Sequence, residues 1–238
     1  MTLENVRLGD TEFDEYADPE AYDRALDRGI SLSGEGKTYF ARGRIAWLAD
    51  CLRSHGLVPS QVLDFGCGTG TATPFLLELL DPARIIGVDT SSRSIETARR
   101  LHGSDRTCFL TLDDYQPCGE IDLAFCNGVF HHIPLDVRRD AVNYVARALR
   151  PQGLFACWEN NPWNPGTRLV MKRIPFDRDA ITLSPPVARR LLASAGLEIL
   201  STHFLFVFPK PLSFCRGLEP WLCRIPTGAQ YQVLCQKP

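Results

Sequence analysis

Short apolar runs alternate with amphipathic stretches over the middle of this chain. The apolar runs have the length of buried strands, and in the stretches between them apolar residues recur at helical spacing. Such alternation predicts a parallel sheet whose strands are joined by right-handed helical crossovers. The predicted strands are 62–65, 84–89, 107–112, 121–126 and 153–158, and the predicted helices are 37–54, 71–80, 92–102 and 135–149.

The pattern changes after residue 158. Residues 159–183 read as irregular, and Ser184 followed by Pro185 predicts the start of a helix that ends at Gly196. Two longer apolar runs, 198–208 and 229–236, predict a final pair of strands. The segment between them is rich in proline and aromatic residues, which suggests an apolar substrate pocket. Its candidate residues, with those of the preceding strand, are Phe204, Phe206, Phe208, Phe214 and Trp221.

A glycine-rich turn follows the first of the predicted strands. Residues 62–70 read Val-Leu-Asp-Phe-Gly-Cys-Gly-Thr-Gly and lead into the helix at 71–80. A strand, a glycine turn and a helix N-terminus together form a pocket of the kind that binds nucleotides. Asp64 places a negative charge just before the turn, and this charge would repel a phosphate. The carboxylate suits a ligand that carries an ammonium and a sulfonium group.

A second acid ends the next strand, which reads Arg-Ile-Ile-Gly-Val-Asp over 84–89. An acid at this position can accept hydrogen bonds from both hydroxyls of a ribose. The glycine turn with Asp64, together with Asp89 and the later Asn127–Gly128, resembles the class I S-adenosylmethionine-dependent methyltransferases. The resemblance is strong over roughly 37–158. It implies a doubly wound, Rossmann-like α/β fold. The seven-stranded sheet would be mostly parallel, with helices on both faces and the last strand inserted antiparallel between its neighbours.

The resemblance also implies roles for individual residues. Asp64 and the glycine turn would hold the methionine end of S-adenosylmethionine, and Asp89 would hold the ribose. Either Asp113 or Asp114 would face the adenine amino group. Either Arg42 or Arg44, on the helix that precedes the first strand, could pair with the methionine carboxylate. The full expected cofactor set is Asp64, Gly66, Cys67, Gly68, Gly70, Asp89, Thr90, Asp113, Asp114, Asn127, Gly128 and Arg44.

The segment after the fourth core strand supplies candidate catalytic residues. Residues 127–134 read Asn-Gly-Val-Phe-His-His-Ile-Pro, which resembles small-molecule and quinone-type methyltransferases. A histidine of near-neutral pKa can take a proton from the attacking hydroxyl, phenol or acidic carbon. We expect His131 in the pocket and His132 in a structural role. Glu159, after the fifth strand, is a candidate second base or substrate anchor. Methyl transfer can also proceed by positioning alone, because the sulfonium is a strong electrophile.

Composition narrows the remaining possibilities. The chain has 238 residues, a formal net charge of −2 and nine cysteines without a Cys-x-x-Cys pair. We therefore expect no metal site, no nucleic-acid partner and a cytoplasmic location without a membrane span or signal peptide. The oligomeric state is left open.

These features predict one methyltransferase domain over 1–238. Within it we expect an N-terminal lid segment (1–56), a cofactor-binding core (57–158) and a substrate-side insertion with the C-terminal strands (159–238). The expected reaction is methylation of an oxygen or acidic carbon of a small, partly apolar molecule. The alternatives are N-methylation of an amino sugar or amine, and a non-catalytic, cofactor-binding regulatory protein.

Overall fold

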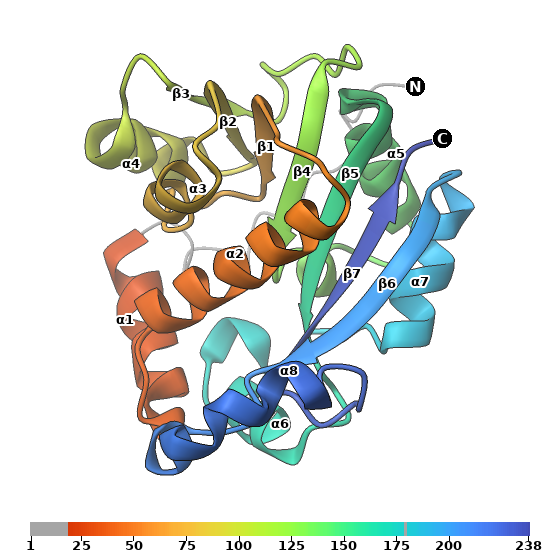
Figure 1. The fold of residues 1–238 in the computed structure, drawn as a ribbon. Coiled ribbons are helices and arrows are strands. Elements are labelled where there is room, and N and C mark those ends of the chain that lie inside the picture. The colour runs from red at the N-terminus through yellow and green to blue at the C-terminus, as the bar shows by residue number, and fades with distance from the viewer. Residues whose placement is uncertain (1–18, 179) are drawn as a thin grey trace.

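Seven strands form a single sheet in the computed structural model, which describes residues 19–178 and 180–238 (Figure 1). The order of the strands across the sheet is β3-β2-β1-β4-β5-β7-β6. Their bounds are β1 Gln61–Phe65, β2 Arg84–Asp89, β3 Thr107–Thr111, β4 Ile121–Asn127, β5 Leu149–Asn160, β6 Glu198–Leu205 and β7 Gln230–Gln236. The predicted doubly wound, Rossmann-like sheet is confirmed.

The last strand runs against its two neighbours. β7 pairs antiparallel with β5 and with β6, whereas β1 to β5 are paired in parallel. β7 therefore lies inside the sheet, with its backbone paired to β5 on one side and to β6 on the other. Val233 and Leu234 point to opposite faces, as successive residues of a strand must, and each is buried.

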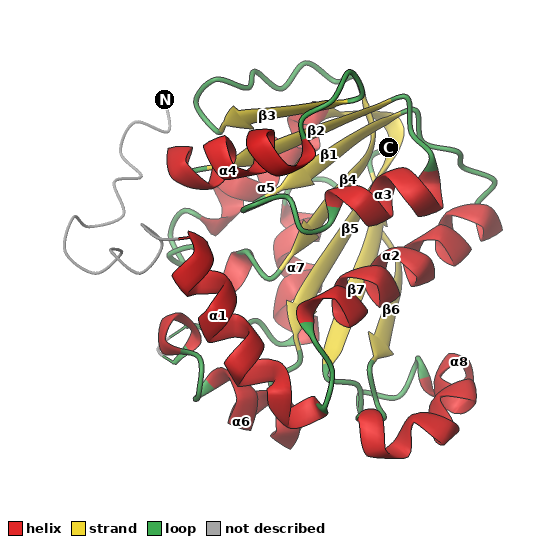
Figure 2. Ribbon diagram, turned by 90° about the vertical axis from the view of Figure 1, so that its left-hand side faces the viewer, coloured by secondary structure: helices red, strands yellow, loops and turns green. Residues whose placement is uncertain are grey.

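Helices cover both faces of the sheet (Figure 2). On one face α2 (Lys37–Ser54) and α3 (Thr73–Leu80) bury Ile45, Leu48 and Leu76 against the strands. On the other, α5 (Arg138–Ala148) and α7 (Pro185–Ser194) bury an equivalent apolar stripe that includes Val142 and Leu192. α5 is shorter than the helix predicted over 135–149, because it begins only at Arg138 and residue 149 already belongs to β5.

The helix α4 (Ser92–His102) begins and ends at the predicted residues. The side chain of Ser91 accepts a hydrogen bond from the Ser94 N–H at 3.2 Å, as expected of an N-cap. Gly103 caps the C-terminal end of the helix. Its φ of −62° is ordinary, but a Cβ there would lie 2.4 Å from the Arg99 carbonyl oxygen.

Additional helices gather beyond the carboxyl ends of β4 and β5 (Figure 1). They are α1 (Pro19–Ile30), η3 (Ser31–Ser33), α6 (Pro165–Met171), η5 (Pro175–Asp177), η6 (Lys210–Leu218) and α8 (Glu219–Leu222), with η4 (Phe130–His132) directly after β4. The prediction of an irregular segment over 159–183 was wrong for α6. Asn164 caps this helix by accepting the Thr167 N–H at 2.9 Å, and Pro165 follows at the first helical position. Residues 1–18 of the predicted lid lie outside the described residues.

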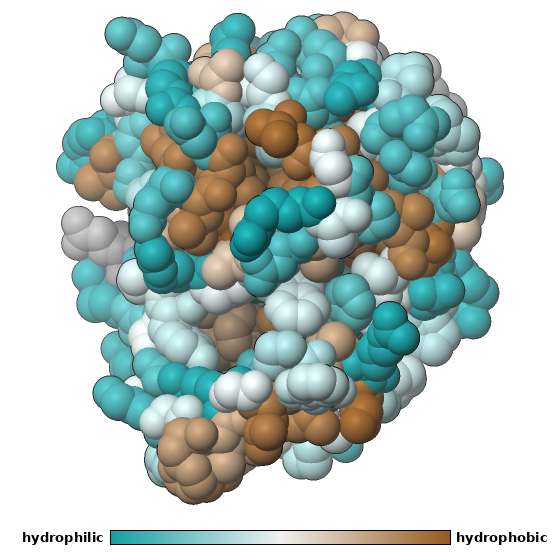
Figure 3. Space-filling view, viewed as in Figure 1, coloured by the Kyte–Doolittle hydropathy of each residue, from teal (hydrophilic) through white to brown (hydrophobic). Residues whose placement is uncertain are grey.

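The aromatic residues of the C-terminal part divide into two groups. Phe206 and Phe208 line the internal cavity, and Phe204 is buried against Tyr231. Phe214 and Trp221 are 81% and 85% exposed, so they form no internal pocket wall. Apolar side chains lie at the surface over η6 and α8 in Figure 3. Among the described residues, no helix is long and apolar enough to cross a membrane.

Candidate functional site

The order of the strands reverses between β1 and β4, and the loops that follow these two strands lie side by side. In open α/β sheets such a reversal marks the ligand crevice. The glycine turn follows β1, and Asn127–Gly128 lies at the end of β4. The turn is fixed to β2, because the Gly66 and Cys67 N–H groups both donate to the Val88 carbonyl at 2.8 and 3.0 Å.

The glycines of the turn are required for two distinct reasons. Gly66 has a φ of +72°, and a Cβ there would lie 2.3 Å from the Val129 side chain. Gly68 has a φ of +53°, but a Cβ there would meet no atom within 4 Å. The first glycine therefore permits close packing against the loop after β4. The second keeps open a space directly above the turn.

One cavity of about 590 Å³ lies above the turn. Its volume is within the range of about 300–1,000 Å³ usual for small-molecule sites. Among the predicted site residues, those that line it are Arg44, Gly66, Cys67, Gly68, Asn127, Gly128, His131 and His132. The predicted residues outside the lining are Asp64, Gly70, Asp89, Thr90, Asp113, Asp114 and Glu159.

The structure distinguishes Arg44 from Arg42. Arg42 is exposed, and its guanidinium is paired with Glu78 on the outer surface. Arg44 is buried in the cavity wall, where its Nη1 donates to Gln230 Oε1 at 2.9 Å. Gln230 Nε2 in turn donates to Asn160 Oδ1 at 3.1 Å, which holds the guanidinium in place. Burial lowers the pKa of Arg44 to about 10, so it remains a cation at neutral pH.

Asp64 lies buried beneath the turn as a second charged group. Burial and the nearby charge of Asp89 together raise the pKa of its carboxyl to about 7, and Arg44 only partly offsets them. Among the described residues, Asp64 Oδ2, Arg44 Nε and Asn127 Oδ1 are buried with no hydrogen-bond partner. A buried polar atom without a partner costs about 1–3 kcal/mol, so these three atoms indicate a polar ligand.

Asp89 supports the turn from the end of β2. Its Oδ2 accepts the Gly68 N–H at 2.9 Å, and its Oδ1 accepts the Ser91 N–H at the same distance. The adjacent Thr90 is exposed. At the end of β3 both candidate acids are exposed, and Asp114 accepts a hydrogen bond from Thr111 Oγ1 at 2.6 Å. That contact closes a local turn, which leaves Asp113 as the better candidate for a ligand contact.

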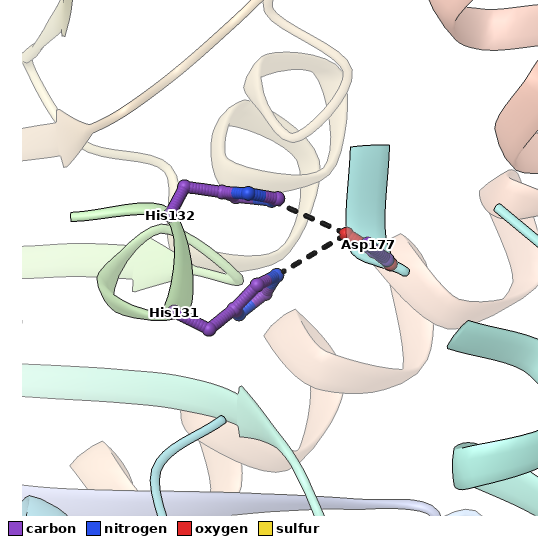
Figure 4. A group of neighbouring side chains, drawn as sticks. All are labelled: His131, His132 and Asp177. Carbon is purple, nitrogen blue, oxygen red and sulfur yellow. Dashed lines mark ion pairs between the residues drawn. The ribbon is translucent and has the colours of Figure 1, made fainter. Parts of the chain in front are cut away.

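The candidate catalytic residues form one buried network. His131 Nδ1 lies 2.6 Å from Glu159 Oε2, and His131 Nε2 lies 3.4 Å from Asp177 Oδ1. His132 Nε2 lies 3.3 Å from the same oxygen of Asp177 (Figure 4). The other oxygen of Glu159 accepts the Phe130 N–H at 2.8 Å. Glu159 is 1% exposed, so both of its oxygens are committed inside the protein.

This network changes the expected character of His131. Burial by itself lowers the pKa of the imidazole, but Glu159 and Asp177 more than offset this effect and raise the pKa to about 10. Burial lowers the pKa of His132. Burial alone would raise the pKa of Asp177, but the two neighbouring histidines lower it to about 2. The expected near-neutral pKa of His131 is therefore not what the structure favours.

Three contributors to the site were not predicted from the sequence. Asp177 lies in the segment 159–183, which was predicted to be irregular, and Gln230 lies in the predicted strand 229–236; neither was a candidate site residue. The helix α1 was not predicted, although Leu26 and Ile30 on it line the cavity at a spacing of one helical turn. Cys67 is buried, and burial raises the pKa of its thiol well above the usual value, which disfavours a role as a nucleophile.

Comparison with known proteins identifies the fold and the cofactor. Residues 63–155 match the model of a methyltransferase domain. Trans-aconitate 2-methyltransferase of Escherichia coli (strain K12 / DH10B) is 28% identical over 186 residues, which cover 73% of each chain. The domain match and this relative support a class I S-adenosylmethionine-dependent methyltransferase.

Solved methyltransferase structures share its fold. A possible histamine N-methyltransferase from Thermotoga maritima superposes with a TM-score of 0.64 at 20% identity, covering 94% of this chain and 98% of that chain. Geranyl diphosphate C-methyltransferase from Streptomyces coelicolor A3(2), in complex with Mg²⁺, a substrate analogue and S-adenosyl-L-homocysteine, gives a TM-score of 0.58 at 17% identity. That match covers 80% of this chain and 75% of the other.

The residues at the turn fit S-adenosylmethionine. Its methionine end carries an ammonium and a carboxylate, and the site offers a carboxylate (Asp64), an amide oxygen (Asn127) and a buried guanidinium (Arg44), each with an unpartnered buried atom. The space above Gly68 admits a ligand close to the backbone. When bound, the cofactor supplies a methyl group on an electrophilic sulfonium. The protein binds and orients it, and the surrounding cavity limits the access of water.

Proposed function

We propose that this methyltransferase methylates a carboxylate oxygen of a small organic acid that also carries an apolar part. The observation that carries the proposal is the enclosure of His131. One ring nitrogen faces Glu159 and the other faces Asp177, so neither is free to take a proton from an acceptor. An acceptor that is already ionised needs no base.

A carboxylic acid meets this condition. Its pKa of about 4 leaves the oxygen ionised at neutral pH, with an electron pair ready for attack. Transfer then forms an O–CH₃ bond, breaks the S–CH₃ bond and releases S-adenosylhomocysteine. An acidic carbon or a protonated amine must first lose a proton. The same enclosure of His131 disfavours both of these acceptors.

The lining of the cavity supports an acceptor with two kinds of surface. Lys37 and Arg216 line it and bring positive charge that favours an anion, although Arg216 is ion-paired with Glu35 of the same lining at 2.9 Å. Leu26, Ile30 and Met171 line the same cavity and favour an apolar part. The similar proteins named trans-aconitate 2-methyltransferase support a small acid as the acceptor class.

An acceptor panel tests this proposal. The purified protein is incubated with S-adenosylmethionine and one acceptor at a time: trans-aconitate, benzoate, phenol or histamine. We expect S-adenosylhomocysteine to form with at least one acid and the product to be an alkali-labile ester. Turnover of phenol or histamine without turnover of either acid would refute the proposal. Cofactor binding without turnover of any of the four would favour the non-catalytic alternative.

A further inference from the structure

His131, His132 and Asp177 converge on one point of the cavity wall. The two histidines belong to η4, and Asp177 arrives from η5, far along the chain. Figure 4 shows both imidazole rings directed at the Asp177 carboxylate. One donor atom from each of the three side chains lies within 4.8 Å of the other two. This convergence was not expected from the sequence, which predicted no metal site.

The spacing between these atoms matches that of ligands on a shared ion. The two Nε2–Oδ1 separations are 3.4 and 3.3 Å, whereas an N–H···O hydrogen bond is usually about 2.7–3.2 Å long. Zinc–ligand distances of about 2.0–2.2 Å in a tetrahedron separate neighbouring ligand atoms by about 3.3–3.5 Å. The separations therefore suit two ligand pairs around one ion better than two direct hydrogen bonds.

The surroundings of His131 resemble the support that metal-bound histidines require. Such a histidine usually turns its second ring nitrogen toward a carboxylate, which fixes the orientation of the ring. Here Glu159 Oε2 lies 2.6 Å from His131 Nδ1, and Glu159 Oε1 accepts the Phe130 N–H at 2.8 Å. This arrangement leaves Nε2 of His131 directed toward Asp177, on the side where a shared ion would lie.

The three side chains also leave room for a further ligand. All three line the 590 Å³ cavity, on the side where Asn127 and Gly128 reach it. Three protein ligands and one open position are the arrangement of metal sites that bind a substrate oxygen. Two imidazoles and one carboxylate suit first-row ions such as Zn²⁺ and Fe²⁺.

We propose that His131, His132 and Asp177 bind one divalent transition-metal ion, such as Zn²⁺, whose open coordination position faces the cavity. The ion would hold an oxygen of the acceptor beside the methyl donor, and no redox step is involved. This inference goes beyond the proposed function and holds whether or not the acceptor is an acid. Glu159 acts as a positioning residue, because its carboxylate contacts His131 Nδ1 and the Phe130 N–H rather than the ion.

Metal titration of the intact protein tests the site directly. Chelator-treated protein is titrated with Zn²⁺ in a calorimeter and with Co²⁺ while its visible absorption is recorded. We expect one equivalent to bind, with Co²⁺ bands typical of nitrogen and oxygen ligands. Asp177→Asn and His132→Ala should each weaken binding by about 100-fold or more, since loss of even a supporting contact costs about 10–100-fold. His55→Ala, at an exposed histidine at the end of α2, should bind as the parent does.

The outcomes separate a metal site from an ion-pair network. The proposal is overturned if the parent shows no saturable binding, or if both ligand variants bind as tightly as the parent. A thiolate-type Co²⁺ spectrum would also overturn it, because the ion would then sit on cysteines such as exposed Cys118. His132 is 20% exposed, so His132→Ala remains informative if Asp177→Asn fails to fold. Turnover is not used as a readout, so this test can fail without the acceptor test failing.

Discussion

Lowering the pH below 7 should weaken cofactor binding, because the buried carboxyl of Asp64 then takes up a proton. Burial and the nearby charge of Asp89 raise its pKa to about 7, and Arg44 from α2 only partly offsets them. The thiols of Cys67 and Cys126 also lie near it, but burial keeps both uncharged by raising their pKa. A protonated Asp64 cannot pair with the ammonium of the cofactor.

The size of the effect follows from the pKa of Asp64. With a pKa of about 7, roughly three-quarters of the carboxyls are ionised at pH 7.5 and about 3% at pH 5.5. If binding requires the ionised form, affinity should fall by about 25-fold between these two pH values. Each further unit of acidification should cost about 1.4 kcal/mol of binding free energy.

The same carboxyl affects folding stability in the opposite direction. Its pKa in the folded protein is raised from the usual 3.8, so the folded state holds the proton more tightly than the unfolded state. The contribution of Asp64 to the free energy of unfolding is therefore fully favourable below pH 3.8 and is lost as the pH rises to about 7. Asp64→Asn removes this loss, so the ligand-free variant should gain stability relative to the parent as the pH rises through that window.

Calorimetry with S-adenosylhomocysteine at pH 5.5, 6.5 and 7.5, with urea unfolding at the same pH values, measures both effects. At pH 7.5 Asp64→Asn should bind about 10–150-fold more weakly, since a hydrogen bond to a charged group contributes about 1.5–3 kcal/mol. Its affinity should change little with pH. Asp105→Asn, at an exposed acid, is the matched control. An equal pH dependence in the parent and in Asp64→Asn would refute this reasoning.

Three further changes test the rest of the cofactor site. Arg44→Met should weaken S-adenosylhomocysteine binding by about 10–150-fold in calorimetry, because a charge-assisted contact is lost. Arg42→Met should leave the binding unchanged, and equal effects of the two changes would contradict the assignment of Arg44. Asp89→Ala should lower the affinity for S-adenosylhomocysteine by a similar factor, because the Gly68 N–H also loses the acceptor that holds the turn. An unaltered dissociation constant would count against a role of Asp89 in cofactor binding. Gly66→Ala should lower the melting temperature clearly more than Gly68→Ala, because only the Cβ at position 66 meets Val129. Equal shifts in thermal unfolding would show that packing against Val129 is not the reason for a glycine at position 66.

The local pattern of the sequence predicted the core of this fold and one side of its site. Strand and helix periodicity are short-range signals, and β1, β2, α4 and α7 therefore begin and end within a residue or two of their predicted bounds. The glycine turn, Asp64 and Asp89 could be located because strand, turn and helix are contiguous in the chain. Parallel strands bring their carboxyl ends to one edge, which also places Asn127 there.

The other side of the site depends on contacts between distant segments. Asp177 reaches the two histidines only because α6 and η5 fold back over the sheet, and Gln230 meets Arg44 only because β7 inserts beside β5. The environment of His131 was equally inaccessible to sequence reasoning. A histidine next to a strand end suggests a base of near-neutral pKa, but burial between two carboxylates reverses that expectation. The sequence thus determined the strands and helices of the core and where the glycine turn lies. The tertiary structure alone decided which charges surround the candidate catalytic residues, because buried electrostatic interactions depend on distances that no local pattern encodes.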